Sequence, residues 1–399
     1  MAGLRQPVWL KPEEVSPLPE GWRALPTEDA CVQLKPGKLF ETKTVLEHGT
    51  VPVLSQSATD FLGYHDGEPG VEASPDKPVV TFANHTCAMR LMKQPFSTIQ
   101  NIFPKVGMPG VTDTVYFYYA SLGRVGLSDY KGHHPIFRLA HIPVPPLAVQ
   151  RRIAGVLSAY DELIENSQRR IRILETMARA LYREWFVHFR FPGHENHSRV
   201  ASSLGDIPKG WEVKNLGAVA EDMRRNVPKG DLDSSQAYVG LEHIPRRSLA
   251  LDAWETTSHL GSNKLKFKKG EVLFGKIRPY FHKVSVAPFD GLCSADTIVI
   301  RARWADHYAF VVACVSSDAF VAHASATANG AKMPRANWDV LEKYELVIPL
   351  GKVAERFSAL FTGIIDQQQA LIFQIQNLRR TRDLLLPRLL SGQVEVEAA

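Results

Sequence analysis

Two long stretches of the chain carry apolar residues at alternating steps of four and three, the pattern of a helix that packs lengthwise on another helix. The first stretch runs from about Leu147 to Phe189. Pro145 and Pro146 suit the first turn of this helix, and Pro192 with the glycine after it ends the pattern. Its predicted seam consists of Ile153, Leu157, Tyr160, Ile164, Ser167, Ile171, Leu174, Ala178, Leu181 and Trp185.

The second stretch runs from about Val353 to Leu386, and Pro387 is expected to end it. Because each seam needs an apolar partner, we expect the two helices to pair antiparallel as a coiled coil about 60 Å long. Polar residues on a seam are more typical of register fixing than of chemistry. The second predicted seam consists of Phe361, Ile364, Gln368, Leu371, Ile375, Leu378, Arg382 and Leu385.

Short runs of β-branched and aromatic residues, separated by turns rich in glycine and proline, fill much of the remaining chain. These runs predict strands in two globular domains, so the expected fold class is α+β. The pattern alone does not fix the fold of either domain. The predicted strands include Pro78–Phe82, Val115–Tyr119, Glu271–Phe274 and Thr297–Ile300.

The sequence repeats itself at a spacing of roughly 190 to 205 residues. Leu18–Trp22 returns as Ile207–Trp211, and the strand at Val79–Phe82 returns at Glu271–Phe274. An Ile-Pro pair precedes both long helices, at Ile142 and at Ile348. Three matches in the same order indicate a tandem duplication. We therefore expect globular domains at residues 1–145 and 191–350, a central helix at 146–190, and a distal helix with a tail at 351–399.

Charge is concentrated in the two helical stretches. The whole chain of 399 residues has a formal net charge of +5, which does not by itself establish nucleic-acid binding. The stretch from Pro146 to Arg190 contains eight arginines and five acidic residues. The stretch from Gly351 to Leu390 contains six basic and three acidic residues. The rest of the chain is therefore near neutral. Any nucleic-acid contact there must come from local basic clusters.

Cysteine usage and hydropathy point to a cytoplasmic protein. The four cysteines form no Cys-x-x-Cys pair, which disfavours a disulfide framework and a zinc site. No apolar run approaches the roughly 18–20 residues of a membrane span, and the N-terminus lacks the apolar core of a signal peptide. We expect no membrane association.

The sequence offers little support for catalysis. It lacks a Gly-Lys-Ser/Thr phosphate loop, a Gly-x-Gly loop after a strand, and the Asn/Asp-Pro-Pro-aromatic motif of an adenine methylase. Pro75-Asp76 and the Glu-x-Lys at Glu212 resemble parts of a nuclease site but lie in different repeats. The His133-His134 pair has no acidic or cysteine companion at metal-ligand spacing. We therefore expect neither catalytic residues nor a bound metal.

The helical segments resemble a known family. Ile142–Ile153 (IPVPPLAVQRRI), Leu157–Asn166 (LSAYDELIEN) and Met177–Phe186 resemble the central conserved region of specificity subunits of type I restriction–modification systems. Leu384–Gly392 (LLLPRLLSG) resembles the end of the second copy, and the two Pro-x-Gly-Trp motifs resemble the starts of recognition domains. One departure is Gly351–Arg356, which replaces the proline-rich, glutamine-containing start of the first helix.

This resemblance implies a non-catalytic reader of double-stranded DNA. Each globular domain would be a target-recognition domain for half of an interrupted site, and the helix pair would set the gap. The implied protein partners are two methyltransferase subunits and the restriction–translocation subunits. The implied chain holds no cofactor itself, since S-adenosylmethionine, ATP and Mg²⁺ belong to those partners.

Candidate DNA contacts come from cations interleaved with aromatic residues. Lys264, Lys266, Lys268 and Lys269 precede a predicted strand, and Lys276–Lys283 follows it. Phosphate contact needs such point charges, whereas reading a base edge needs Arg, Lys, Asn or Gln on a rigid element. A solvated basic face is the alternative interpretation. The candidates are Asn84, His85, Arg90, Lys131, His133, His134, Lys268, Lys269, Lys276, Arg278, Tyr280, Lys283, Lys332 and Arg335.

Two other functions remain open at the level of the sequence. A restriction or modification enzyme with its own recognition domains would transfer methyl groups without partners, but its motifs are missing. A coiled-coil scaffold with no nucleic-acid role would show no salt-sensitive retention of DNA, whereas a DNA reader should weaken steeply as salt rises.

Overall fold

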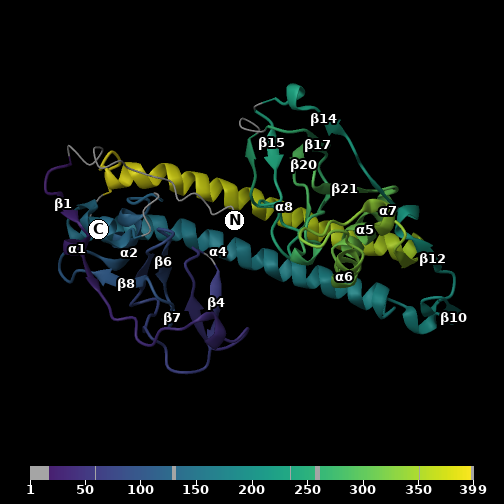
Figure 1. Cartoon of the computed structure of the whole chain (residues 1–399), viewed down its shortest axis with the longest axis horizontal. Helices are drawn as coiled ribbons and strands as arrows, with labels where there is room; N and C mark the ends of the chain where they lie inside the picture. Colours follow the sequence, from purple (N-terminus) through teal and green to yellow (C-terminus); the bar gives the residue numbers. More distant parts are fainter. Residues whose placement is uncertain are drawn as a thin grey trace. The chain divides into compact units, whose positions relative to one another are not determined.

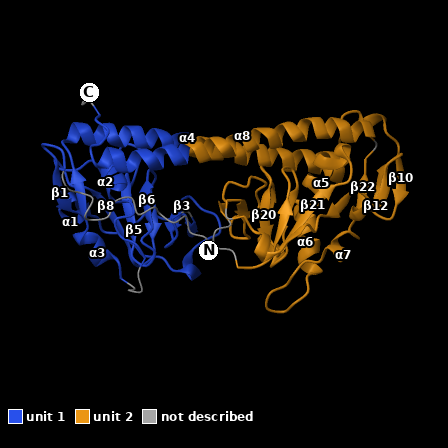
Figure 2. Ribbon diagram, turned by 90° about the horizontal axis from the view of Figure 1, so that it is seen from above, with its two compact units in different colours: residues 1–163, 378–399 blue, residues 164–377 orange. Residues whose placement is uncertain are grey.

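The computed structural model describes residues 18–58, 60–127, 132–233, 235–256, 261–349 and 351–396. The chain divides into two compact units: unit 1 comprises residues 1–163 and 378–399, and unit 2 comprises residues 164–377 (Figure 2). Each unit combines one globular part with a portion of each long helix. These units follow other boundaries than the predicted segments 1–145, 146–190, 191–350 and 351–399, because the helices pack on the globular parts.

Unit 1 contains two sheets and a two-stranded ribbon (Figure 1). The four-stranded antiparallel sheet has the order β2 (Cys31–Gln33), β8 (Ile102–Gly107), β5 (Val79–Ala83), β6 (Met89–Met92). The three-stranded sheet has the order β4 (Phe61–His65), β3 (Val51–Leu54), β7 (Ser97–Thr98), with β3 and β7 parallel. The ribbon pairs β1 (Arg23–Pro26) with β9 (His141–Val144). Its short helices are α1 (Thr27–Ala30), η2 (Thr42–Thr44), α2 (Thr114–Ser121) and α3 (His134–Leu139).

Unit 2 repeats this plan with additions. Its four-stranded sheet has the order β13 (Ala220–Asp222), β21 (Thr297–Ala302), β18 (Val272–Gly275), β19 (Val284–Val286). Its five-stranded sheet has the order β14 (Asn226–Val227), β17 (Lys264–Phe267), β20 (Gly291–Ser294), β15 (Ala237–Val239), β16 (Glu255–Thr256). Two ribbons pair β10 (Arg199–Ser202) with β11 (Gly205–Pro208), and β12 (Glu212–Asn215) with β22 (Glu345–Ile348). Its short helices are η4 (His194–Asn196), η5 (Leu216–Ala218), η6 (Lys229–Asp231), η7 (Pro279–Phe281), η8 (Ala305–His307), α5 (Tyr308–Val315), α6 (Asp318–Ala326) and α7 (Trp338–Leu341).

The two units share one order of strands. In the four-stranded sheets, β2-β8-β5-β6 and β13-β21-β18-β19 are traversed in the same sequence along the chain. The other sheet of each unit contains one parallel pair of strands, β3–β7 in unit 1 and β15–β20 in unit 2. Unit 2 adds β17 and β14 to this sheet. The shared order supports the tandem duplication predicted from the repeated motifs.

The two Pro-x-Gly-Trp motifs form the same turn. The Trp22 N–H donates to the Pro19 carbonyl at 3.1 Å, and the Trp211 N–H donates to the Pro208 carbonyl at 3.1 Å. The glycines between them have φ of 81° and 88°, a left-handed conformation that glycine adopts without a steric penalty. The repeated sequence therefore encodes a repeated backbone conformation.

The long helices α4 (Leu147–Tyr182) and α8 (Gly351–Leu390) supply core residues to both units. In unit 1, Ile153 and Leu157 near the start of α4 lie in one buried cluster with Leu386 near the end of α8. In unit 2, Trp185 lies in the π-helical turn η3 (Arg183–Val187) that continues α4, and its ring is 5.7 Å from that of Phe357 near the start of α8. The pairing is therefore antiparallel. Every predicted seam residue is buried or half-buried, as packing along a seam requires.

Two expectations about secondary structure are wrong. Val115–Tyr119 was expected to be a strand but lies in α2, because the Asp113 carboxylate caps the helix by accepting from the Val115 and Tyr116 N–H groups at 2.9 Å. Pro387 does not end α8, which continues to Leu390. A proline in the last turn removes only one hydrogen bond, and Leu386, Leu389 and Leu390 are buried in the unit 1 core.

Within the described residues, no single helix is both long and apolar enough to cross a membrane. The consecutive segments Ala305–Val315 and Asp318–Ala326, bent by 65°, pass that test only when taken together.

Candidate nucleic-acid interface

The turn between β18 and β19 of unit 2 carries four of the predicted contact residues in an unusual backbone conformation. Arg278 and His282 both adopt left-handed φ, at 49° and 52°, on either side of the short helix Pro279–Phe281. Such a conformation is disfavoured for residues with a Cβ, and it persists only where neighbouring contacts hold it. Tyr280, in the middle of this short helix, is 56% exposed.

Two other predicted contact residues, Lys332 and Arg335, lie in a segment that pairs with this turn. The Arg278 N–H donates to the Pro334 carbonyl at 2.8 Å, and the Ala336 N–H donates to the Lys276 carbonyl at 2.9 Å. Between these bonds, Ile277 and Arg335 form an isolated antiparallel bridge. The two basic clusters, more than fifty residues apart in the sequence, therefore form one surface.

The charges on this surface are only partly neutralised. Lys276 donates its ammonium to the Ala295 carbonyl at 3.1 Å, and the Arg335 guanidinium lies 3.4 Å from the Asp296 carboxylate. Across the described part of unit 2, no carboxylate forms an ion pair with Arg278 or Lys332. These two cations are available to a polyanion.

Lys283 is placed differently from the other cations of this turn. Its ammonium donates to the Leu241 carbonyl and is half-buried. Burial, together with repulsion from Arg246, lowers the pKa of Lys283. Lys283 thus stabilises the turn from within, and its direct contact with DNA stays a prediction.

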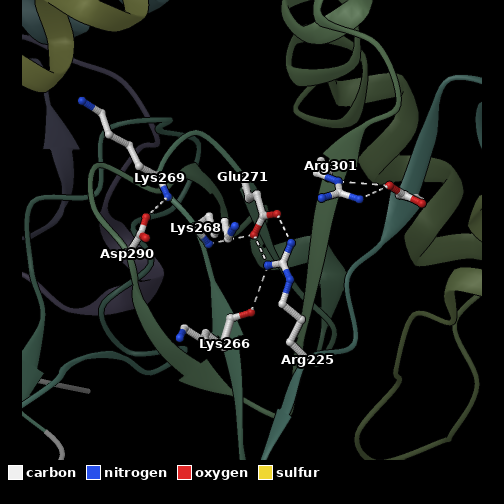
Figure 3. Close-up of polar contacts among 8 residues, drawn as sticks. Arg225, Lys266, Lys268, Lys269, Glu271, Asp290 and Arg301 are labelled. Atoms are coloured by element: carbon white, nitrogen blue, oxygen red, sulfur yellow. Dashed lines mark hydrogen bonds and ion pairs between the residues drawn. The ribbon is translucent and has the colours of Figure 1, made fainter.

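Lys268 and Lys269 lie at the opposite end of β18 (Figure 3). Arg225 forms two hydrogen bonds of 2.8 and 2.6 Å with the buried Glu271 carboxylate, which also accepts from the Lys268 N–H at 2.8 Å. The Lys269 N–H donates to Asp290 at 2.8 Å. The basic run predicted as one cluster is thus split by a strand of four residues, about 13 Å long.

Lys264 precedes β18 as predicted, but it is itself the first residue of β17 and is buried. Its ammonium donates to the Ser262 hydroxyl at 2.6 Å and lies 5.5 Å from the centre of the Tyr238 ring. Burial lowers the pKa of this ammonium. Lys264 is therefore part of the fold of the sheet rather than of an exposed basic face.

The corresponding turn of unit 1, between β5 and β6, has the same hydrogen-bond frame. The Asn84 N–H donates to the Asn101 carbonyl at 2.9 Å, as the Lys276 N–H does to the Asp296 carbonyl at 2.8 Å. The Asn84 carbonyl accepts from the His133 N–H at 3.2 Å, where Lys276 accepts from Ala336. Asn84 and Lys276 therefore occupy equivalent positions in the hydrogen-bond frames of the two sheets.

The side chains at the unit 1 turn are polar amides and imidazoles rather than cations. His85 is exposed, and its ring nitrogen lies 3.1 Å from the Asn101 amide. Gln56 accepts from the His85 N–H at 3.3 Å and donates to the Asn101 carbonyl at 3.2 Å. Such amides match the donor and acceptor pattern of an adenine edge.

Three further candidates in unit 1 have partners inside the protein. Arg90 is buried, and its guanidinium donates to the Ser57 and Asp60 carbonyls. His133 is also buried, with its ring nitrogen 2.9 Å from the Asn84 carbonyl. His134 stacks on Phe103 with ring centres 3.7 Å apart. Their role at DNA stays a prediction, and Lys131 lies outside the described residues.

His134 is neutral at physiological pH. Burial, followed by the positive charges of Lys105 and Arg138, lowers the pKa of His134 to about 4. Any contact that this ring makes with a ligand near pH 7 is therefore a neutral hydrogen bond.

One grouping of potential metal ligands occurs among the described residues: the ligand atoms of Glu242, His243 and Glu255 lie within 4.8 Å of one another. His243 Nδ1 accepts a hydrogen bond from the Gly240 N–H at 2.9 Å. The neutral ring then carries its proton on Nε2, so neither nitrogen presents a free lone pair. This geometry does not suit a metal ligand.

Arg246 is an exposed cation near the turn between β18 and β19, and it was not predicted from the sequence as a contact residue. The Arg246 guanidinium carbon lies 4.2 Å from the centre of the Phe281 ring, although 35 residues separate the two in the chain. The only signal in the sequence is the arginine doublet that follows Ile244-Pro245.

Comparisons with known proteins extend these observations. The chain is 26% identical over 331 residues to the type I restriction enzyme MjaIX specificity subunit of Methanocaldococcus jannaschii, covering 77% of this chain and 75% of that protein. It is 30% identical over 125 residues to the type I restriction enzyme EcoDI specificity subunit of Escherichia coli, covering 30% of this chain and 28% of that protein. No family model matches the chain.

In structure, the chain is similar to the S subunit of a type I restriction–modification system from M. genitalium. The TM-score is 0.58 at 12% identity, over 96% of this chain and 98% of that one. At this identity the likeness concerns the fold. The resemblance to type I specificity subunits and the α+β fold class with its long helices are confirmed.

Proposed function

We propose that this chain, a relative of the type I restriction enzyme specificity subunits, reads a bipartite DNA site and assembles methyltransferase and restriction subunits on it. Methyl transfer, ATP hydrolysis and cleavage belong to those partners, together with S-adenosylmethionine, ATP and Mg²⁺. The chain itself acts in the cytoplasm as a non-catalytic DNA reader.

The observation that carries this proposal is the equivalence of the turns after β5 and β18. Both turns are held by the same backbone hydrogen bonds, through Asn84 in unit 1 and Lys276 in unit 2. Their polar side chains differ in kind, with the exposed His85 and Asn101 in one and the half-buried Arg278 and exposed Lys332 in the other. Two equivalent frames with different side chains suit a protein that reads two different half-sites.

The outer faces of the long helices support the proposed assembly role. In unit 2, Ile173 and Met177 on α4 are exposed, as are Leu360 and Phe373 on α8. In unit 1, Leu384 on α8 is exposed as well. Exposed apolar side chains on a helix face are typical of a docking surface for another subunit. We propose that two methyltransferase subunits dock along these helices.

Sequencing of methylated bases in cells with and without the intact gene tests the proposal. The expected result is an adenine-methylated bipartite motif that disappears when the gene is removed. An unchanged methylation pattern in an otherwise active system would contradict the proposal. Methyl transfer by the purified chain alone would instead favour an enzyme with its own recognition domains, and salt-insensitive behaviour with no DNA retention would favour a scaffold.

The modularity of the reading is tested by Arg278→Ala. Because Arg278 belongs to unit 2, the change should relax one half of the motif and leave the other half intact. An equal loss at both halves would contradict independent reading by the two units.

A further inference from the structure

The geometry points to Arg246 as a DNA-contacting residue of unit 2, which offers the edge of its guanidinium to a paired acceptor on the duplex. Two acceptors on DNA have this chemistry: the O6 and N7 atoms of a guanine, and two oxygens of a phosphate. This inference rests on the proposed function and adds a specific contact to it.

The contact between Arg246 and an aromatic ring leaves its hydrogen-bond donors free. Its guanidinium carbon lies 4.2 Å from the centre of the Phe281 ring, and that of Arg278 lies 6.0 Å from the same ring. The attraction between a cation and an aromatic ring does not require the guanidinium N–H groups to form hydrogen bonds, so these groups remain donors for another acceptor. The arginine is thereby oriented without its donors being consumed.

The charge of Arg246 is also free. Its side chain is exposed, and no described carboxylate forms an ion pair with it. By contrast, the next residue, Arg247, pairs with Asp318 at 2.7 Å. The arginine doublet thus divides its roles: Arg247 fixes the segment to α6, and Arg246 remains available to a partner outside the chain.

The turn between β18 and β19 holds the backbone of this segment on one side. Arg246 forms an isolated bridge with Lys283, and the Arg247 N–H donates to the His282 carbonyl at 2.8 Å. The Val286 N–H of β19 then donates to the Leu249 carbonyl at 3.0 Å. Arg246 therefore lies at the same end of the sheet as the turn that carries Arg278.

Helix α4 holds the segment on its other side. The Glu175 carboxylate is buried and accepts from the Ser248 hydroxyl at 2.5 Å and from the Leu249 N–H at 2.8 Å. Arg179, one turn later in α4, donates to the Arg247 carbonyl at 3.1 Å. A side chain that reads a base needs such a rigid support, because an error of 1 Å weakens a bidentate contact.

Selection of binding sites from randomised duplexes tests this inference, with the full chain in complex with its methyltransferase subunits. The informative variants are Arg246→Ala, Arg246→Lys, which keeps the charge but not the fork, and Phe281→Leu, which removes the ring beneath it. Arg199→Ala is the matched control, because Arg199 also lies over a phenylalanine, Phe189 at 5.8 Å, but on the separate ribbon of β10 and β11. Thermal unfolding of each variant establishes that it folds.

We expect Arg246→Ala to weaken binding to the preferred duplex by roughly 5- to 150-fold, with Phe281→Leu intermediate and Arg199→Ala unchanged. If the acceptor is a guanine, the preference at one position of the motif disappears and lysine does not restore it. If the acceptor is a phosphate, all sequences weaken alike, the salt slope falls by about 1, and lysine restores most of the affinity.

A wild-type complex that selects a bipartite motif, beside an Arg246→Ala complex with the same motif and affinity, would overturn the inference and leave the proposed function standing. A wild-type complex that selects no sequence would overturn the proposed function itself, and the inference with it.

Discussion

Removal of the Arg382 guanidinium should destabilise unit 1, because this group pairs with the Asp161 carboxylate, which joins three elements. The Asp161 carboxylate of α4 accepts from Arg382 of α8 at 2.5 Å and from the Tyr119 hydroxyl of α2 at 2.5 Å. Arg382 also contacts Asp383 at 2.8 Å. Burial works against its charge, yet the two carboxylates raise the pKa of Arg382. The helix pair and the globular part of unit 1 therefore share one polar contact.

The exposure of this ion pair sets the expected magnitude. The side chains of Arg382 and Asp161 are each 28% exposed. Pairs at the surface contribute about 0 to 1 kcal/mol, and removal of one partner from a fully buried pair costs about 3 to 5 kcal/mol. Partial exposure places Arg382→Met between these limits, at about 2 kcal/mol of unfolding free energy after allowance for screening by solvent.

Urea unfolding followed by circular dichroism measures this loss, since urea, unlike guanidinium chloride, does not screen ion pairs. Arg380→Met, which removes an exposed cation from the same helix, should change the free energy of unfolding by less than about 0.5 kcal/mol. In a double-mutant cycle with Asp161→Asn, we expect a coupling energy of at least about 1 kcal/mol. Equal losses for Arg382→Met and Arg380→Met, or additive losses in the cycle, would refute the reasoning.

Two further predictions concern pH and the repeated turns. Because the folded chain protonates His134 only near its pKa of about 4, while the unfolded chain does so near 6.5, stability should fall as pH drops from about 6.5 to 4. His134→Leu should flatten this part of the curve of unfolding free energy against pH, and a curve parallel to the wild type would contradict the assignment. Gly21→Ala and Gly210→Ala should each lower stability by about 1 to 2 kcal/mol in thermal unfolding, because both need positive φ. Gly126→Ala, in open space without positive φ, should be near neutral, and unequal costs at Gly21 and Gly210 would argue against equivalent turns.

The helix seams could be predicted because their signal is local. Apolar residues such as Leu157 and Phe361 are spaced so that they fall on one face of a helix. The spacing therefore predicts which face of each helix is buried. The apolar pattern could not predict the residue at which each helix ends, since the ends depend on tertiary packing. Leu389 and Leu390 are buried in unit 1 and keep α8 helical beyond Pro387.

The error at Val115–Tyr119 shows a limit of propensity. Aromatic and β-branched residues favour strands on average, but one capping carboxylate, that of Asp113, satisfies two N–H groups and begins a helix. The site has a similar limit. Charge density identified Arg278 and Arg335 as candidates, whereas their pairing, and the approach of Arg246 to Phe281, arise from contacts between distant segments.

The ribbons that close each globular part have a consequence for how such a chain can change. In unit 1 the chain enters at Arg23 and leaves at Val144, which stand opposite each other in one ribbon, and in unit 2 Glu212 stands opposite Ile348. In each unit, the two points at which the chain enters and leaves the globular part are therefore neighbours in space, and both sheets of that part lie between them in the sequence. Recombination at those positions would exchange a whole globular part as one segment, and the buried faces of α4 and α8 would keep their complementarity.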